Sequence, residues 1–259
     1  MDLEKKGWLF LNLLIRDVHN RYSGGILGGG WLLLQPLLTL AIYFVVFTTI
    51  FKIRVPEAEG VSFLAFVALG LWPWMAFQEA LMKGTMAIAG NAALVKKVSF
   101  PNELLVYAAV FSTYFVHLLG MLIVVIAMHL FVTPLHLEFI PLLLLLLGVM
   151  LLLTLALALF IAPLQVIFRD TDQFIAPLLA MAFYATPILY PARMVPEWMQ
   201  NLIWLNPMTY FVERSRELLM QGVVQIGLTD LLMLLVCAAI FWIARVFFVR
   251  LAGYFDDYL

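Results

Sequence analysis

Long apolar runs alternate with short polar connections along most of the chain. A helix that crosses the hydrocarbon of a bilayer needs about 20 mostly apolar residues, and the longest runs reach or approach that length. The leucine-rich stretch between Pro141 and Pro163 shows no alternation of apolar and polar positions, so its pattern indicates a helix and not a strand of a membrane barrel. The pattern predicts an all-α integral membrane protein with six transmembrane helices, at residues 31–51, 61–81, 104–131, 139–168, 174–190 and 231–248.

The composition agrees with a membrane protein. The chain is 65% hydrophobic and 12% charged, with a mean hydropathy of +1.04, whereas soluble domains are roughly half apolar and about a quarter charged. No polar segment is long enough to hold an appended soluble domain. We therefore expect a single transmembrane domain over residues 1–259, with an interface helix and hinge at 1–30 and the six-span bundle at 31–259.

The distribution of lysine and arginine predicts the orientation, because cytoplasmic loops carry an excess of these residues. The side that holds both termini in a six-span arrangement collects most of them: Lys5, Lys6, Arg16, Arg21, Lys83, Lys96, Lys97, Arg169, Arg245 and Arg250. We expect a multi-pass membrane protein with both termini in the cytoplasm. The charged first residues and the short apolar run after them predict no cleavable signal peptide.

The segment from Leu3 to Tyr22 has the pattern of an amphipathic helix that lies in the membrane surface. Its two faces carry different residues: Lys5, Asn12, Arg16 and His19 on the polar face, and Leu3, Phe10, Leu11, Leu14 and Val18 on the apolar face. The glycine-rich residues 24–30 follow, without the lysine and hydroxyl residue that a Walker phosphate loop requires. We expect a hinge that turns the chain into the first span, with a flexible linker as the alternative.

Two connections between the predicted spans stand out by their length. Residues 82–103 hold a short apolar turn followed by Lys96 and Lys97, which predicts a short interfacial helix that presents both lysines to a partner or to anionic lipid. Lysines that only set the topology are the alternative. Residues 191–229 are too apolar for a solvated linker; Pro196 and Pro207 divide them into two short amphipathic helices, which we expect to dip into the outer half of the membrane beside protein or a water-filled cavity.

Few ionisable residues occur within the predicted spans. Glu79 stands four residues before Lys83, which predicts an ordinary ion pair, while His117 and His129 are about three helical turns apart and cannot share a metal. No zinc-binding or nucleophile motif is present. Aromatic residues are more frequent, and they either contact sugar faces along a channel or pack in the bundle and face lipid: Tyr43, Phe44, Phe47, Trp72, Trp74, Phe77, Phe183 and Tyr184.

Four stretches of the sequence resemble the ABC-2 type permeases, specifically the transmembrane subunits of polysaccharide exporters for O-antigen, capsule and teichoic acid. They are RYSGGILGGGWLLLQPL at 21–37, NAALVKKVSFPNELL at 91–105, FRDTDQF at 168–174 and TPILYPARMVPEWMQNLIWLNPMTYFVERSREL at 186–218. The second and fourth stretches are the most specific, because residue types and spacing both match. The sequence departs from the family at residues 28–30, where members often carry a bulky residue.

The resemblance implies a transport subunit that is not itself an enzyme. Such a permease forms a homodimer with two copies of a separate ABC ATPase, so ATP and magnesium would bind to the partner and no cofactor to this chain. The implied substrate is a lipid-linked, O-antigen-like polysaccharide, which would cross the cytoplasmic (inner) membrane through a channel at the permease dimer. The implied partners are therefore a second copy, the ATPase, the glycan and membrane lipid, and no nucleic acid.

The resemblance also implies roles for particular residues. Coupling to the ATPase would involve the segment 91–101 and the second cytoplasmic turn, through Asn91, Leu94, Val95, Lys96, Lys97, Phe100, Pro101, Arg169 and Asp170. The interface helix beside them would contribute Arg16, Arg21 and Tyr22. The outer gate helices would contain Pro196, Trp198, Asn206, Pro207, Glu213 and Arg216, and Glu213 and Arg216 are spaced to pair on one helical face.

Three other functions remain open from the sequence. An ABC-2 permease for a drug or small lipid would have the same general pattern. A membrane-embedded enzyme acting on lipid-linked sugars would depend on Glu79 or His117. A scaffold without transport is disfavoured by the apolar outer helices, because irregular backbone at that depth requires a cavity or a protein partner.

Overall fold

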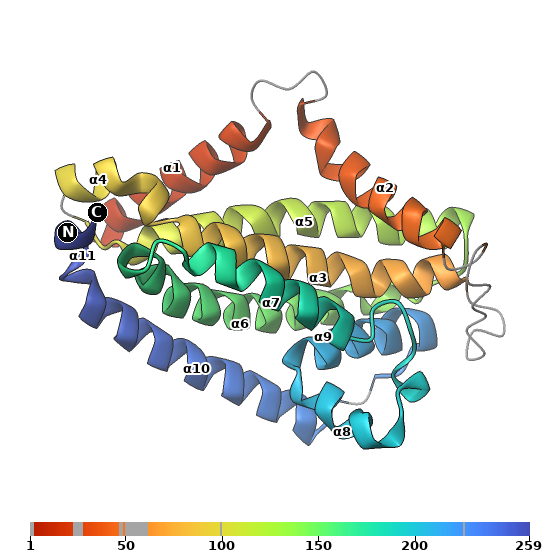
Figure 1. Ribbon diagram of the computed structural model, residues 1–259. Helices are drawn as coiled ribbons and strands as arrows, with labels where there is room; N and C mark the ends of the chain where they lie inside the picture. The colour runs from red at the N-terminus through yellow and green to blue at the C-terminus, as the bar shows by residue number, and fades with distance from the viewer. Residues whose placement is uncertain (1–2, 23–27, 47–48, 50–61, 99, 225) are drawn as a thin grey trace.

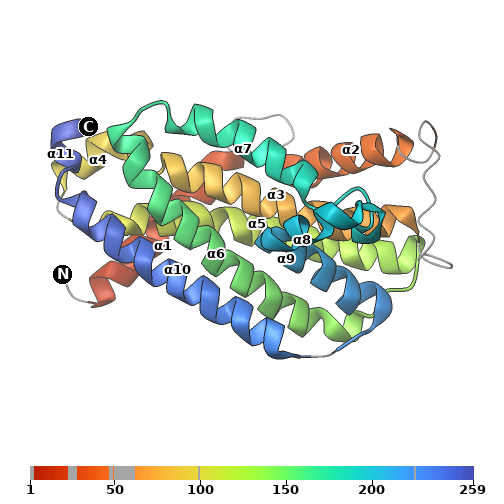
Figure 2. The ribbon, with the colours of Figure 1, turned by 60° about the horizontal axis from the view of Figure 1, so that its bottom comes forward.

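The computed structural model describes residues 3–22, 28–46, 49, 62–98, 100–224 and 226–259, and all regular secondary structure in these residues is helical. Long helices run side by side to form a bundle, while shorter helices lie on its surface and at its two ends (Figures 1 and 2). Short 3₁₀ turns occur at Gly28–Gly30, Ala89–Asn91, Leu137–Phe139 and Ala192–Met194, and a π-helical turn occurs at Glu217–Gln221. The helical class predicted from the sequence is confirmed for these residues.

Within the described part of the chain, four helices are long and apolar enough to cross a membrane. They are α3 (Phe63–Met86), α5 (Glu103–Phe131), α6 (Ile140–Ile167) with the turn before it, and α10 (Leu228–Ala252). These four match the second, third, fourth and sixth predicted spans. The described residues therefore fit a multi-pass membrane protein with four candidate spans, two fewer than the sequence predicted.

The other two predicted spans correspond to shorter helices. Both α2 (Trp31–Val45) and α7 (Thr171–Ala185) contain 15 residues, which at 1.5 Å per residue is roughly 22 Å, less than the hydrocarbon thickness of about 30 Å. Helix α7 ends five residues before the predicted boundary. The reason is Pro187, because the residue before a proline avoids helical geometry, and Thr186 is extended with a ψ of 134°.

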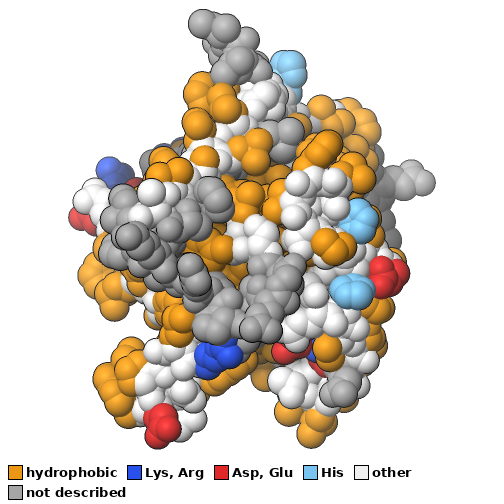
Figure 3. Space-filling model, turned by 90° about the vertical axis from the view of Figure 1, so that its right-hand side faces the viewer, with side chains coloured by type: hydrophobic (Ala, Val, Ile, Leu, Met, Phe, Trp, Pro, Cys, Tyr) orange, Lys and Arg blue, Asp and Glu red, His pale blue; other side chains and the backbone are white. Residues whose placement is uncertain are grey.

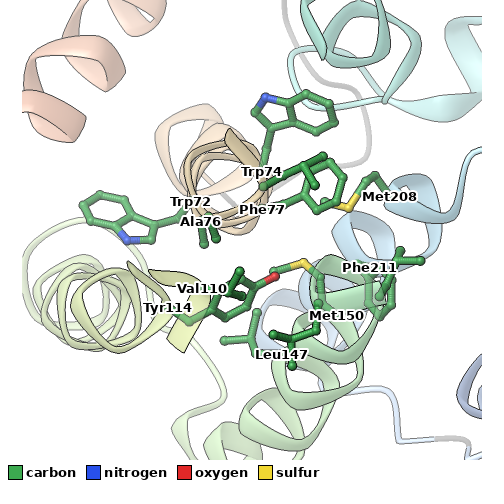
Figure 4. Packing of buried hydrophobic residues seen from close by; sticks show 14 of the residues in the cluster. Trp72, Trp74, Ala76, Phe77, Val110, Tyr114, Leu147, Met150, Met208 and Phe211 are labelled. Atoms are coloured by element: carbon green, nitrogen blue, oxygen red, sulfur yellow. The ribbon is translucent and has the colours of Figure 1, made fainter. Parts of the chain in front are cut away.

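Helix α3 is the centre of the bundle. It contacts α2, α5, α6, α7 and α9 (Pro207–Arg216), and 78% of its most apolar window is buried, against 17% for α10. The close-up in Figure 4 shows α3, α5, α6 and α9 directing side chains such as Phe77, Val110, Met150 and Phe211 into one shared core. Helix α10 packs mainly on α6 at the edge of the bundle.

Helix α1 (Leu3–Tyr22) is formed as predicted, and Phe10, Leu14 and Val18 of its predicted apolar face are partly buried. It packs on α5, where Phe10 and Phe111 meet edge to face at 5.7 Å, Leu13 is buried, and the Ser112 hydroxyl donates to the Asp17 carboxylate. Leu11, which shares the predicted apolar face with Phe10, is more than half exposed. Because Ser112 supplies a hydrogen-bond donor for Asp17, a polar residue can lie on the packed face.

The short helices occupy opposite ends of the bundle. Helices α4 (Ala92–Lys97) and α11 (Phe255–Tyr258) lie at the end that also holds both chain termini (Figure 1). Helices α8 (Glu197–Leu205) and α9 lie toward the other end, which Figure 3 faces and where charged side chains stand among many apolar ones. The two helices predicted to begin near Pro196 and Pro207 are therefore confirmed, and the Asn206 side chain caps α9 by accepting from the Met208 amide at 3.0 Å.

Candidate functional site

An aromatic cluster lies where α2, α3 and α7 meet. Trp74 is at its centre, with ring centroids 5.6 Å from Phe77 and 5.7 Å from Phe183. Phe183 stacks on Tyr43 at 6.1 Å and meets Tyr184 edge to face at 5.3 Å. Five of the predicted channel residues, from three helices, are therefore brought together.

The cluster extends from the core of the bundle to its surface. Trp74 is 1% exposed and Phe77 is 5% exposed, whereas Tyr184 is 69% exposed. The indole of Trp74 donates to the Gln78 side chain at 2.7 Å, which fixes the ring. The inner rings thus form a rigid base, and the ring at the α7 surface can contact a molecule outside the chain.

Trp72 lies apart from this cluster, although the sequence grouped it with the others. Figure 4 shows Trp72 and Trp74 pointing away from α3 in different directions. The Trp72 indole donates to the His117 carbonyl at 3.0 Å, and a Cβ on Gly120 would lie 2.9 Å from its ring. Trp72 therefore packs α3 against α5. Phe47 and the side chain of Phe44 lie outside the described residues.

Glu79 has a second partner that the sequence did not suggest. Its carboxylate lies 3.9 Å from the Lys83 ammonium, as the four-residue spacing predicted, and 2.7 Å from His117 Nε2. His117 comes from α5, 38 residues later, so no local pattern could reveal the contact. The described residues contain no group of three His, Cys, Asp or Glu side chains that could hold a metal.

The segment predicted to couple to an ATPase forms a compact corner at the end of α3. The Asn91 side chain accepts from Arg16 at 2.9 Å and donates to the Ala87 carbonyl at 2.9 Å, so it connects α1 to the start of α4. Lys96 and Lys97 are exposed. Their neighbours are packed on the core to different degrees: Val95 is buried, and Leu94 and Phe100 are partly buried.

The α6–α7 turn lies at the same end of the bundle as α4 (Figures 1 and 2). Arg169 and Asp170 are exposed there. Gln165 closes the turn, because its amide donates to the Arg169 carbonyl at 2.8 Å and accepts from the Asp172 amide at 2.7 Å. The role of Gln165 was not apparent from the sequence. The signal that could have found it is a glutamine at the end of an apolar run, just before a polar turn.

Arg216 at the end of α9 is a buried anchor between distant parts of the chain. It pairs with Glu213 at 2.8 Å, as their spacing predicted, and it also donates to the carbonyls of Phe66 at 3.1 Å, Pro187 at 2.6 Å and Ile188 at 2.7 Å. Its guanidinium lies 3.5 Å from the centroid of the Phe66 ring, which is a cation–π distance. The side chain therefore fastens α9 to α3 and to the break after α7.

A second cluster of charged residues, centred on Arg214, lies close to Arg216 in the sequence and lines a hollow. Arg214 contacts Glu217 at 2.7 Å and Asp230 at 3.2 Å, and the Tyr210 hydroxyl donates to Asp230 at 2.6 Å. Burial raises the pKa of the Tyr210 hydroxyl most, and the hydrogen bond to Asp230 raises it further. The hydroxyl therefore stays protonated and donates. Together with Trp204 these residues line a hollow of about 400 Å³.

The remaining gate candidates have separate positions. Trp198 on α8 is 73% exposed, and Asn206 donates to the Thr186 hydroxyl at 2.7 Å, which links the α8–α9 corner to the end of α7. Of the interface-helix candidates, Arg16 is placed as given above, while the side chains of Arg21 and Tyr22 lie outside the described ones.

Comparison with known proteins identifies relatives over most of the chain. The family model described as "ABC-2 type transporter" matches residues 9–220. An O-antigen export system permease protein RfbA of Klebsiella pneumoniae is 29% identical over 84% of this chain and 83% of its own length. A protein of the same name from Myxococcus xanthus is 31% identical, covering 77% of this chain and 75% of its own.

A relative with a different printed substrate also matches. The polysialic acid transport protein KpsM of Escherichia coli is 26% identical over 84% of this chain and 83% of its own length. Because the family model covers most of the chain and the relatives align over about four fifths of it, this protein belongs to the ABC-2 type transporter family of membrane permeases.

Proposed function

We propose that the chain is the transmembrane permease of an ATP-driven exporter that moves a lipid-linked, O-antigen-like polysaccharide across the cytoplasmic membrane. The observation that carries the proposal is the aromatic cluster shared by α2, α3 and α7, which reaches the surface at Tyr184. The relatives named for O-antigen and polysialic acid transport support the same class of substrate. Rings contact sugar C–H groups without strong fixed hydrogen bonds, which allows a polymer to keep moving.

The proposed topology has six spans and two cytoplasmic termini. Helices α2 and α7, with the residues that flank them, would complete the six. The outer helices α8 and α9 would enter the outer half of the bilayer without crossing it. Such irregular backbone requires internal hydrogen-bond partners, and Arg216 supplies them by donating to the carbonyls of Pro187 and Ile188.

The proposed assembly contains two copies of this chain and two copies of a separate ABC ATPase, which would bind ATP and magnesium. Helix α4 with its exposed Lys96 and Lys97, and the α6–α7 turn with Arg169 and Asp170, would contact the ATPase. Asn91 would pass movement of α4 to α1, because its amide bonds to Arg16 at that corner. Aromatic rings at the dimer would then line the path of the glycan.

The test measures glycan at the cell surface after replacement of the outer rings of the cluster. Phe183→Ala together with Tyr184→Ala should reduce glycan export several-fold while the permease still assembles with its ATPase. Phe160→Ala is the matched control, since Phe160 stacks on Phe247 of α10 and lies outside the cluster. Unchanged export with altered efflux of a small amphiphile would instead favour a drug or lipid permease.

A further inference from the structure

A groove runs between two of the spanning helices on a side of the bundle that the aromatic cluster does not reach. Helix α5 forms one wall with Phe111 and Phe115, and α6 forms the other with Leu144 and Leu151, one to each side of Gly148. Helix α3 forms the floor. The hollow has a volume of about 310 Å³, and apolar cavities of about half this size already hold a benzene molecule.

Gly148 differs from the other described glycines of the helices long enough to span a membrane. Gly84 and Gly120 are required by close packing, because a Cβ would lie 2.7 Å from the Ala158 Cβ in the first case and 2.9 Å from the Trp72 ring in the second. A Cβ on Gly148 would meet nothing within 4 Å. Glycine in a helix interior costs about 1 kcal/mol relative to alanine. No contact with the described residues accounts for it here, whereas a side chain at this position would narrow the groove.

The polar groups along the groove are already paired. The Tyr114 hydroxyl bonds to the Thr154 hydroxyl at 2.6 Å, and His117 Nε2 bonds to Glu79 at 2.7 Å. The remaining lining is hydrocarbon and aromatic surface. The groove therefore suits a guest without polar atoms.

We propose that the groove binds one acyl chain of a membrane phospholipid, held at a fixed position between α5 and α6. Both helices are long and apolar enough to span the membrane, and Phe115 and Leu144 at the groove are exposed. Its open side therefore lies on the outer surface of the bundle, where acyl chains are the abundant hydrocarbon of a bilayer. The free energy of binding comes from dispersion contacts and shape complementarity, since an acyl chain that leaves bulk lipid gains no hydrophobic free energy. The gap at Gly148, between Leu144 and Leu151, lets the acyl chain cross α6.

The first experiment counts retained phospholipid by native mass spectrometry of the whole permease assembly, purified in mild detergent. Gly148→Trp should abolish retention of one phospholipid per chain, because the indole fills the groove without a backbone clash. Leu145→Trp is the matched control, since it adds the same ring to an exposed position of α6 and should leave retention unchanged. Equal retention in both variants would overturn the proposal.

The second experiment identifies the guest directly in vesicles of phosphatidylethanolamine and phosphatidylglycerol. A benzophenone amino acid replaces Phe115, and its crosslinked products are analysed after illumination. A phospholipid adduct that falls several-fold in the Gly148→Trp background supports the site. An adduct to a second protein chain, or labelling that Gly148→Trp does not change, contradicts it; neither result bears on glycan export.

Discussion

At the residue scale, buried polar side chains hold distant parts of this chain together. Arg216 is 2% exposed and bonds to the carbonyls of Phe66, Pro187 and Ile188 as well as to Glu213. The pairing with Glu213 could be predicted, because residues three apart share a helical face. The carbonyl partners could not, since they lie up to 150 residues away and backbone groups carry no sequence signal.

Arg216→Met should strongly destabilise the permease. It would leave Glu213 without its buried cation and the carbonyls without their donor, a loss of about 3 to 5 kcal/mol. The measurement is the fraction of folded protein after heating, read by size-exclusion chromatography. Glu213→Gln combined with Arg216→Met should recover part of the loss, and a single variant that melts like the native protein would contradict this account.

Gly84 tests the close approach of α3 to α5 and α6. An added Cβ would lie 2.7 Å from Ala158 and 2.9 Å from Val110, both short side chains with little room to move. Gly84→Ala should therefore cost about 1 to 3 kcal/mol by overpacking, measured by the same heating assay. Gly148→Ala is the matched control and should be neutral or stabilising; equal effects of the two substitutions would argue against tight packing at Gly84.

At the scale of elements, hydropathy and proline positions were good guides to where helices occur. They located α3, α5, α6 and α10, and Pro207 correctly marked the start of α9. The apolar face of α1 was predictable from its own pattern, whereas the contact of Asp17 with Ser112 of α5 was not. The early end of α7 could have been read from Pro187, since a residue before proline disfavours the helix.

Helix α4 gives a prediction that belongs to a single element. Lys96→Glu together with Lys97→Glu should reduce co-purification of the ATPase subunit several-fold and leave the permease folded, because both side chains are exposed. Arg250→Glu, an exposed charge reversal on α10, is the control. Unchanged binding of the ATPase by the lysine variant would remove α4 from the proposed contact.

For the whole molecule, composition was sufficient to predict the membrane class, and four quoted motifs were sufficient to predict the family. The arrangement of the helices was not predictable to the same extent. Trp72 and Trp74 are two residues apart and were grouped together, yet one packs on α5 and the other joins the cluster with α2 and α7. Only the rotation of α3 within the bundle distinguishes them.

The proposed dimer can be tested by crosslinking variants that carry a single cysteine in each chain. In a Cys237→Ala background, which removes the native cysteine, Tyr184→Cys should be joined across the dimer by a bismaleimide reagent in membranes. Trp242→Cys on the exposed face of α10 is the control and should remain monomeric on a denaturing gel. Crosslinking at position 242 and not at 184 would place the dimer interface elsewhere.

The bonds of Arg216 also bear on the order in which the protein is assembled during its synthesis. Phe66 leaves the ribosome 150 residues before the arginine that bonds to its carbonyl. The α3 end of the nascent chain must therefore remain incompletely packed while α5, α6 and α7 are delivered to the membrane. Closure of this end is a late event of biogenesis, which depends on translation having passed residue 216.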